Sequence, residues 1–143
     1  MISKLLIAWS LTALCVIVHA IGMTALLRWV NQTVERIGTR FWFSTWMLVR
    51  TAGWIILLHL IGITFWAFFY TWRDAFPDLV SALYFSAVTY TTTGYGDLVL
   101  PQEWRLVGGV EALTGILMCG WSAAFFFAVV SRMNETRSKP AQS

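Results

Sequence analysis

Three apolar stretches, each long enough to cross a lipid bilayer as a helix, make up most of this 143-residue sequence. They run from Leu5 to Val30, from Met47 to Trp72 and from Trp104 to Val130. About 20 apolar residues span the hydrocarbon core at a helical rise of about 1.5 Å per residue. We therefore expect an all-α membrane protein with three transmembrane helices per subunit.

The composition argues against several other classes of protein. Hydrophobic residues make up 58% of the chain and charged residues 12%, a balance that few soluble folds tolerate. The net charge of +3 is spread too thinly to indicate nucleic acid, and nine Trp residues suit a protein with two membrane interfaces. No nucleophile-base pair, metal-ligand spacing or phosphate-binding loop is visible, so we expect no enzyme and no organic cofactor.

Residues 1–46 are predicted to form an N-terminal transmembrane helix followed by an interfacial connector. The connector, residues 31–46, combines charged side chains with clustered aromatic residues, as expected at a headgroup boundary. A cleaved signal peptide is the alternative for the first stretch, because Lys4 precedes it and Val18-His19-Ala20 offers small residues to a peptidase. His19 and His59 each stand alone in an apolar span, and we assign them no function.

The segment between the second and third stretches is too short to cross a membrane. Residues 79–90 are compatible with a helix of about 18 Å, and the motif Thr91-Thr92-Thr93-Gly94-Tyr95-Gly96-Asp97 follows it. Irregular backbone is tolerated at membrane depth only where protein buries it or water lines it. We therefore predict a re-entrant helix with a return loop, so that the second span ends and the third begins on the same side.

Charge asymmetry predicts the orientation of the chain. Basic residues that flank the connector or follow the third stretch are expected to be cytoplasmic: Arg28, Arg36, Arg40, Arg50, Arg132, Arg137 and Lys139. The N-terminus then lies outside and the C-terminus in the cytoplasm, although Lys4 on the outside runs against the rule. Residues 134–143 are polar and are predicted to form a disordered tail.

Two glycines in the loop permit an unusual backbone. Gly94 and Gly96 allow positive φ at alternate residues, so that consecutive carbonyl oxygens can point the same way, which strand geometry forbids. The motif TTTGYGD, placed after a short helix and between two spans, resembles the selectivity filter of the potassium channel family. The resemblance covers about residues 50–132.

This resemblance implies a homotetramer in a cell membrane that conducts K⁺ passively and selectively. The permeant K⁺ would be bound by the carbonyl oxygens of Thr92, Thr93, Gly94 and Tyr95, with Gly96 completing the filter. The implied pore domain covers 47–133, with an outer helix at 47–72, a pore helix at 79–90, the filter at 91–97 and an inner helix at 104–131. A non-conducting auxiliary subunit that co-assembles with other channel subunits is the alternative.

The resemblance also implies roles for residues around the filter. Thr93 replaces the Val that is usual in the family, which bears on the exclusion of sodium. Asp97 would lie at the outer mouth with Tyr84 as its hydrogen-bond partner, and Tyr95 would pack behind the filter.

Glu111 is the residue that is most costly to place inside a span, because a carboxyl there must face protein or water. We expect it behind the pore helix, protonated and bracing the filter, with Thr89, Thr91 or the filter backbone as partners. A purely structural hydrogen bond to a neighbouring helix is the alternative.

The inner helix carries four further candidates. Gly115 stands where the family often has a hinge glycine, and close helix packing is an equal alternative. Cys119, Ala123 and Phe127 recur at helical spacing and are predicted to line the cavity, with Phe127 as a hydrophobic gate. Packing against protein or lipid is the alternative for Phe127.

Overall fold

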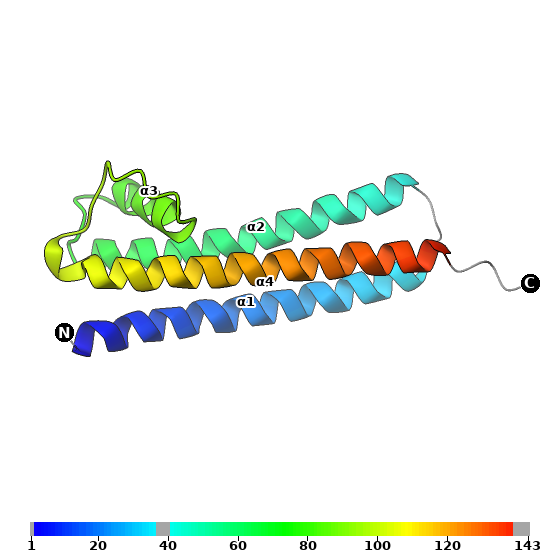
Figure 1. Cartoon of the computed structure of the whole chain (residues 1–143), viewed down its shortest axis with the longest axis horizontal. Coiled ribbons are helices and arrows are strands. Elements are labelled where there is room, and N and C mark those ends of the chain that lie inside the picture. Colours follow the sequence, from blue (N-terminus) through cyan, green and yellow to red (C-terminus); the bar gives the residue numbers. More distant parts are fainter. Residues whose placement is uncertain (1, 37–40, 139–143) are drawn as a thin grey trace, which may run out of the picture.

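The computed structural model describes residues 2–36 and 41–138, and helices account for nearly all of them (Figure 1). The elements are α1 (Ile2–Arg36), α2 (Phe41–Trp72), α3 (Leu79–Tyr90), a 3-10 turn (Gln102–Trp104) and α4 (Arg105–Ser138). Three helices are long and apolar enough to cross a membrane. The expected all-α membrane fold is therefore confirmed.

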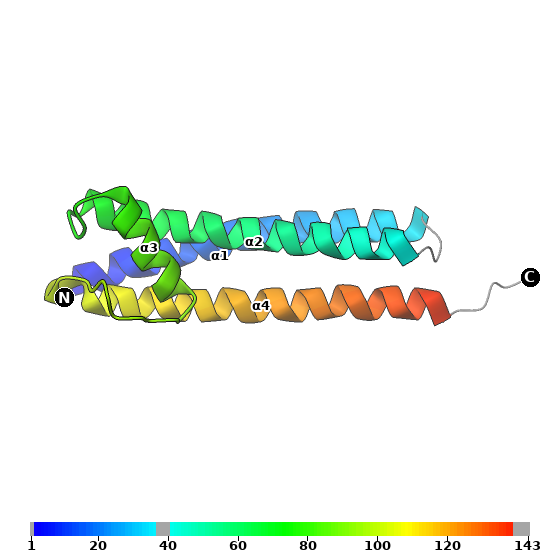
Figure 2. The same cartoon turned by 90° about the horizontal axis from the view of Figure 1, so that it is seen from above.

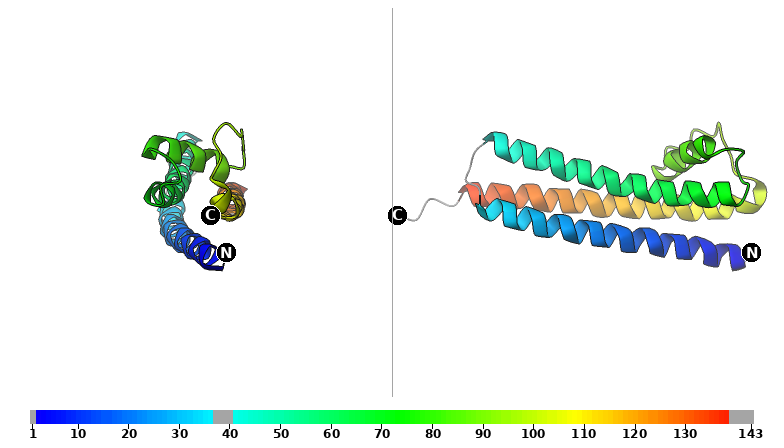
Figure 3. Two further views of the ribbon diagram at one scale, coloured as in Figure 1. Left: turned by 90° about the vertical axis from the view of Figure 1, so that its left-hand side faces the viewer. Right: turned by 180° about the vertical axis from the view of Figure 1, so that it is seen from behind.

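The three long helices run alongside one another, with α2 antiparallel to α1 and α4 (Figures 1 and 2). The short α3 crosses obliquely over α2 and α4 at one end, which we call the α3 end. Helix α1 packs against α2 and α4 on the side away from α3 (Figure 3). The N-terminal end of α1 lies at the α3 end, and α4 finishes at the opposite end (Figure 1).

The long helices extend beyond the stretches predicted from hydropathy. Helix α1 continues to Arg36, α2 begins at Phe41 and α4 runs to Ser138, so residues 134–138 are helical where a disordered tail was predicted. A helix of 32 residues is about 48 Å long, whereas the hydrocarbon core is about 30 Å thick. The ends therefore protrude into the interfaces, where polar residues continue a helix without cost. Residues 37–40 of the predicted connector and 139–143 of the predicted tail lie outside the described residues.

An aromatic cluster joins α2 to α3 and to the 3-10 turn that precedes α4. Tyr70 of α2 meets Phe85 of α3 edge to face at 5.4 Å between ring centroids, and Phe69 meets Trp104 in the same manner at 5.5 Å. Trp66 and Tyr70 are fully buried. Such pairs contribute about 0.5–1.5 kcal/mol beyond the area that they bury. The cluster fixes the position of α3 and of the loop that follows it.

Two polar contacts complete the α3 end. The Asp78 carboxylate caps α3 by accepting from the Ser81 backbone N–H at 2.8 Å, and this hydrogen bond lowers the pKa of Asp78. Lys4 pairs with Glu103 at 2.7 Å and lies over the Trp104 ring at 4.3 Å. Lys4, which ran against the charge rule, therefore has an anionic and an aromatic partner at this end of the molecule.

Candidate functional site

The Thr91–Asp97 loop begins directly at the C-terminal end of α3. The backbone N–H groups of Thr93 and Gly94 both donate to the Val88 carbonyl oxygen, at 2.9 and 3.3 Å. These bonds satisfy a carbonyl that the helix leaves unpaired at its last turn. The start of the loop is therefore hydrogen-bonded to the end of α3.

Every second residue of the loop has a left-handed backbone. The φ angles are +58° at Thr92, +58° at Gly94 and +76° at Gly96. The two glycines were expected from the sequence, whereas Thr92 was not. A β-branched residue at positive φ is strained by about 1–3 kcal/mol, and such strain concentrates at functional sites. Alternation of this kind lets successive carbonyl oxygens face the same way.

The hydroxyl of Thr93 has a partner within the loop. It lies 2.9 Å from the Thr91 hydroxyl, which in turn donates to the Ala87 carbonyl oxygen at 2.7 Å. Because a hydroxyl has one hydrogen, the Thr93 hydroxyl is the donor to Thr91. The polar group that distinguishes Thr93 from Val is thus hydrogen-bonded inside the chain.

Tyr84 and Asp97 pair as the sequence predicted. The Tyr84 hydroxyl donates to the Asp97 carboxylate at 2.7 Å, and this hydrogen bond holds the pKa of Asp97 below its ordinary value. Tyr95 is 71% exposed in the single chain, and its packing behind the loop stays a prediction. Any surface that covers Tyr95 must come from outside this chain.

Glu111 is completely buried behind α3 and joins three helices. The Tyr70 hydroxyl of α2 donates to its carboxyl group at 2.7 Å, and the Ser86 hydroxyl of α3 contacts the other oxygen. The predicted partners Thr89 and Thr91 are therefore wrong. Ser86 also donates to the Ile63 carbonyl oxygen at 2.9 Å. One hydroxyl hydrogen cannot serve both acceptors, and a protonated Glu111 that donates to Ser86 satisfies every group.

Gly115 lies against the backbone at the end of α3. A methyl group placed on it would lie 1.8 Å from the Tyr90 carbonyl oxygen and 2.7 Å from the carbonyl carbon. Only glycine, which has no side chain, lets α4 come this close to the Tyr90 backbone. This is the close helix packing that was the alternative to a hinge at Gly115. The hinge role of Gly115 stays a prediction.

A chain of buried and half-buried polar side chains connects all four helices. His19 of α1 and His59 of α2 place their Nε2 atoms 3.0 and 3.1 Å from the Ser122 hydroxyl of α4. His59 also lies 3.5 Å from the Tyr90 hydroxyl of α3 through its other nitrogen. No sequence motif predicts these contacts, because each histidine stands alone in its own span. No group of three metal-ligating side chains occurs among the described residues.

The predicted cavity residues lie on an uncovered face of α4. Cys119, Ala123 and Phe127 are all exposed, and Phe127 is 73% exposed. Ala123 and Phe127 also line an apolar groove between α4 and α2, together with Ile55 and Ile56. In the single chain these side chains therefore have little protein around them.

Comparison with known proteins identifies a family for the region just described. The profile of a family described as ion channel matches residues 53–132, which is more than half of the chain. The match includes α3, the Thr91–Asp97 loop and most of α2 and α4. Comparisons with curated proteins and with solved structures found no match.

Substitution of Gly115 tests the contact between α3 and α4. We expect Gly115→Ala to lower the free energy of unfolding by about 1–3 kcal/mol, because the new methyl group must push the Tyr90 backbone away. Gly109→Ala in the same helix is the matched control, since a side chain there meets nothing within 4 Å. Thermal unfolding in detergent measures both. Equal effects of the two variants would contradict the close contact.

Two substitutions separate the roles of Glu111. Glu111→Ala leaves the buried Tyr70 hydroxyl without an acceptor, and we expect a loss of about 1–3 kcal/mol in unfolding free energy. Glu111→Gln keeps an acceptor and a donor and should unfold near the wild-type temperature. Infrared spectra of the wild type should contain the carbonyl stretch of a protonated carboxylic acid that Glu111→Gln lacks. Its absence from the wild type would rule out protonation.

The hydrogen bond from Tyr84 makes a prediction about Asp97. Because this hydrogen bond lowers the pKa of Asp97 in the folded state, it stabilises the fold at pH values above the ordinary pKa of aspartate. That stabilisation is lost as the pH falls through the lowered pKa of Asp97. We expect Tyr84→Phe to raise the pKa of Asp97 to its ordinary range. Titration of ¹³C-labelled aspartates by NMR measures this, with Asp78 as an internal control because Ser81 lowers its pKa. An unchanged Asp97 curve would show that Tyr84 has no effect.

Proposed function

This chain belongs to the ion channel family, and on that premise we propose that four copies of it form a potassium-selective channel. It is a multi-pass membrane protein with three helices of spanning length. In the proposed channel, α2 is the outer helix, α3 the pore helix, the Thr91–Asp97 loop the filter and α4 the inner helix.

The observation that carries this proposal is the alternating left-handed backbone at Thr92, Gly94 and Gly96. A K⁺ ion that sheds its water needs rings of oxygen ligands, several in succession, so that it can leave as readily as it enters. Carbonyl oxygens of residues 92–96 would supply these rings, with K⁺ bound at residues 92–95. In this proposal backbone carbonyl oxygens hold the K⁺, and no organic cofactor takes part.

A homotetramer is proposed because one chain supplies only one loop, whereas a complete filter needs four. The surfaces that a neighbour would cover are exposed and apolar in the single chain. Tyr95, Leu113, Ile116 and Phe127 are between 59% and 73% exposed. Four copies around an axis would place Tyr95 against a neighbouring subunit and Phe127 near the cavity or its gate.

The orientation follows from the basic residues at the end opposite α3. Arg28, Arg50 and Arg132 lie towards that end, which we propose to be cytoplasmic. The filter and the N-terminus then face the outside, and Asp97 would attract cations at the outer mouth. The C-terminal end of α3 would direct its partial negative charge towards a cation in the cavity.

Helix α1 and the buried polar groups are proposed to hold the filter in place. Glu111 joins α4 to α3 near the filter, and Ser122 links α1 to α2 and through His59 to Tyr90. These links reach Ser86 and Tyr90 in the C-terminal half of α3, which leads directly into the filter. The Thr93 hydroxyl is hydrogen-bonded to the Thr91 hydroxyl. It would therefore not compete with the Thr93 carbonyl oxygen, which would remain a ligand for K⁺.

Ion flux from purified protein in liposomes tests the proposal. We expect flux down a K⁺ gradient but little down a Na⁺ gradient, and Ba²⁺ should block it because it fits the same filter. Gly94→Ala should lose most of the flux or the selectivity, because an L-residue at this φ costs about 1–2 kcal/mol in each subunit. Gly109→Ala serves as the matched control, and native mass spectrometry gives the number of subunits.

Three outcomes would contradict parts of this proposal. Equal K⁺ and Na⁺ flux would reject potassium selectivity, and a stable assembly other than a tetramer would reject the proposed stoichiometry. A tetramer that is folded but never conducts would favour the auxiliary-subunit alternative.

A further inference from the structure

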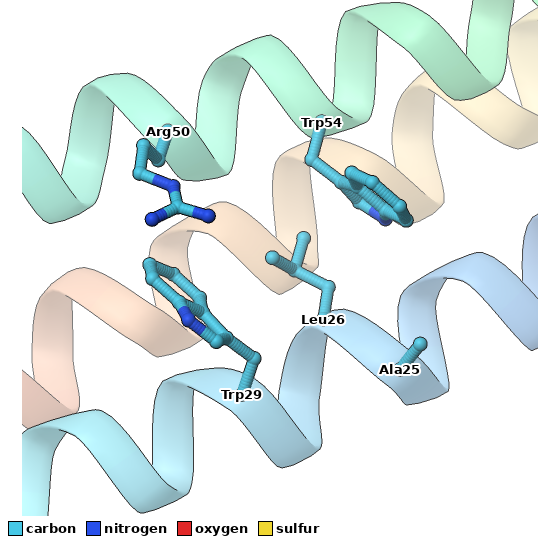
Figure 4. Close-up of a pocket in the computed structure, with 5 residues that line it drawn as sticks. All are labelled: Ala25, Leu26, Trp29, Arg50 and Trp54. Carbon is cyan, nitrogen blue, oxygen red and sulfur yellow. The ribbon is translucent and has the colours of Figure 1, made fainter.

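A slot lies between α1 and α2 (Figure 4), and its lining residues belong to the halves of these helices away from the α3 end. We call it the Arg50 slot, and it is lined by Ala25, Leu26, Trp29, Arg50 and Trp54. All the lining side chains except Arg50 are apolar or aromatic. Figure 4 shows the Arg50 guanidinium beside the Trp29 ring, with Leu26 between them and Trp54.

The guanidinium of Arg50 is held by aromatic rings rather than by an anion. It lies 4.7 Å from the centroid of Trp29 and 4.6 Å from that of Trp46. Stacking on ring faces leaves the N–H donors at the edge of the guanidinium free for another ligand. These donors match the oxygen atoms of a phosphate group, which Arg binds through two parallel hydrogen bonds.

No described carboxylate is available to Arg50. Glu111 is buried against Ser86 and Tyr70, and the other acidic side chains that the structure describes lie at the α3 end: Asp74, Asp78, Asp97 and Glu103. The electrostatic complement of the Arg50 guanidinium is therefore an anionic group.

The depth of Arg50 points to a lipid headgroup as that ligand. Arg50 is nine residues into α2, about 13 Å along the helix, and about 9 Å at each end of α2 extends past the hydrocarbon core. The Cα atom thus lies just inside the boundary, where an arginine side chain reaches the headgroup level. Indole rings are favoured at the same level.

We propose that the Arg50 slot binds one anionic phospholipid from the leaflet at this end, with its phosphate at Arg50 and an acyl chain along Leu26 and Trp54. The orientation of the Trp54 ring is held by a hydrogen bond, because its Nε1 donates to the Gly22 carbonyl oxygen of α1 at 3.1 Å. The ring therefore offers a fixed apolar surface to an acyl chain. A lipid in this position contacts both helices and would strengthen the packing of α1 on α2. The site is independent of ion conduction.

Native mass spectrometry of the full-length, delipidated protein tests this site by titration with phosphatidylglycerol and phosphatidylcholine of identical chains. We expect tighter binding of phosphatidylglycerol, and Arg50→Gln should weaken it about tenfold, as loss of a charged hydrogen bond predicts. Ala25→Trp should weaken it similarly by filling the slot while leaving Arg50 in place. This second variant keeps the test decisive if Arg50→Gln does not fold.

Arg73→Gln is the matched control. Arg73 also lies over two indoles, at 5.6 Å from Trp72 and 5.0 Å from Trp104, but at the α3 end and near the carboxylate of Glu103. Its replacement should leave phosphatidylglycerol binding unchanged. Unaltered binding in both slot variants, an equal loss in Arg73→Gln, or equal affinity for phosphatidylcholine would overturn the proposal.

Discussion

The close contact between the end of α3 and Gly115 of α4 is the constraint on which the rest of the structure depends. It brings the Tyr90 carbonyl group to a distance from α4 that no side chain would allow. The Thr91–Asp97 loop leaves α3 one residue later, so its position is determined by this contact. The left-handed residues of the loop then decide where its carbonyl oxygens point.

Polar side chains inside this apolar protein explain how the contact between α3 and Gly115 of α4 is maintained, because they fix the position of each helix along its neighbours. Glu111 connects Tyr70 of α2 with Ser86 of α3, and His19 and His59 meet at Ser122. A buried polar group without a partner is costly, so each of these side chains favours one relative placement of its helices. Apolar packing alone would tolerate sliding. Helix α1 thereby becomes part of the support of α3, although α1 lies on the far side of α2 and α4 (Figure 3).

The two ends of the molecule use the same residue types for different purposes. At the α3 end, Lys4 and Arg73 lie over Trp104 and have Glu103 nearby, so their charge is compensated within the chain. At the opposite end, Arg50 stacks on Trp29 and Trp46 without a described carboxylate. Because Arg73 has a carboxylate nearby and Arg50 has none among the described side chains, we place an anionic lipid at Arg50 and none at Arg73.

The sequence by itself determined the class of fold, the short helix over residues 79–90 and the loop motif, because hydropathy, segment length and glycine positions are local properties. The pairing of Tyr84 with Asp97 was also predictable, since both lie within one short segment. Only the tertiary structure decided the partners of Glu111 and the meeting of His19, His59 and Ser122, because these groups come from different helices and share no motif. It also decided that Thr92 adopts a left-handed backbone, which its residue type disfavours and the surrounding hydrogen bonds impose.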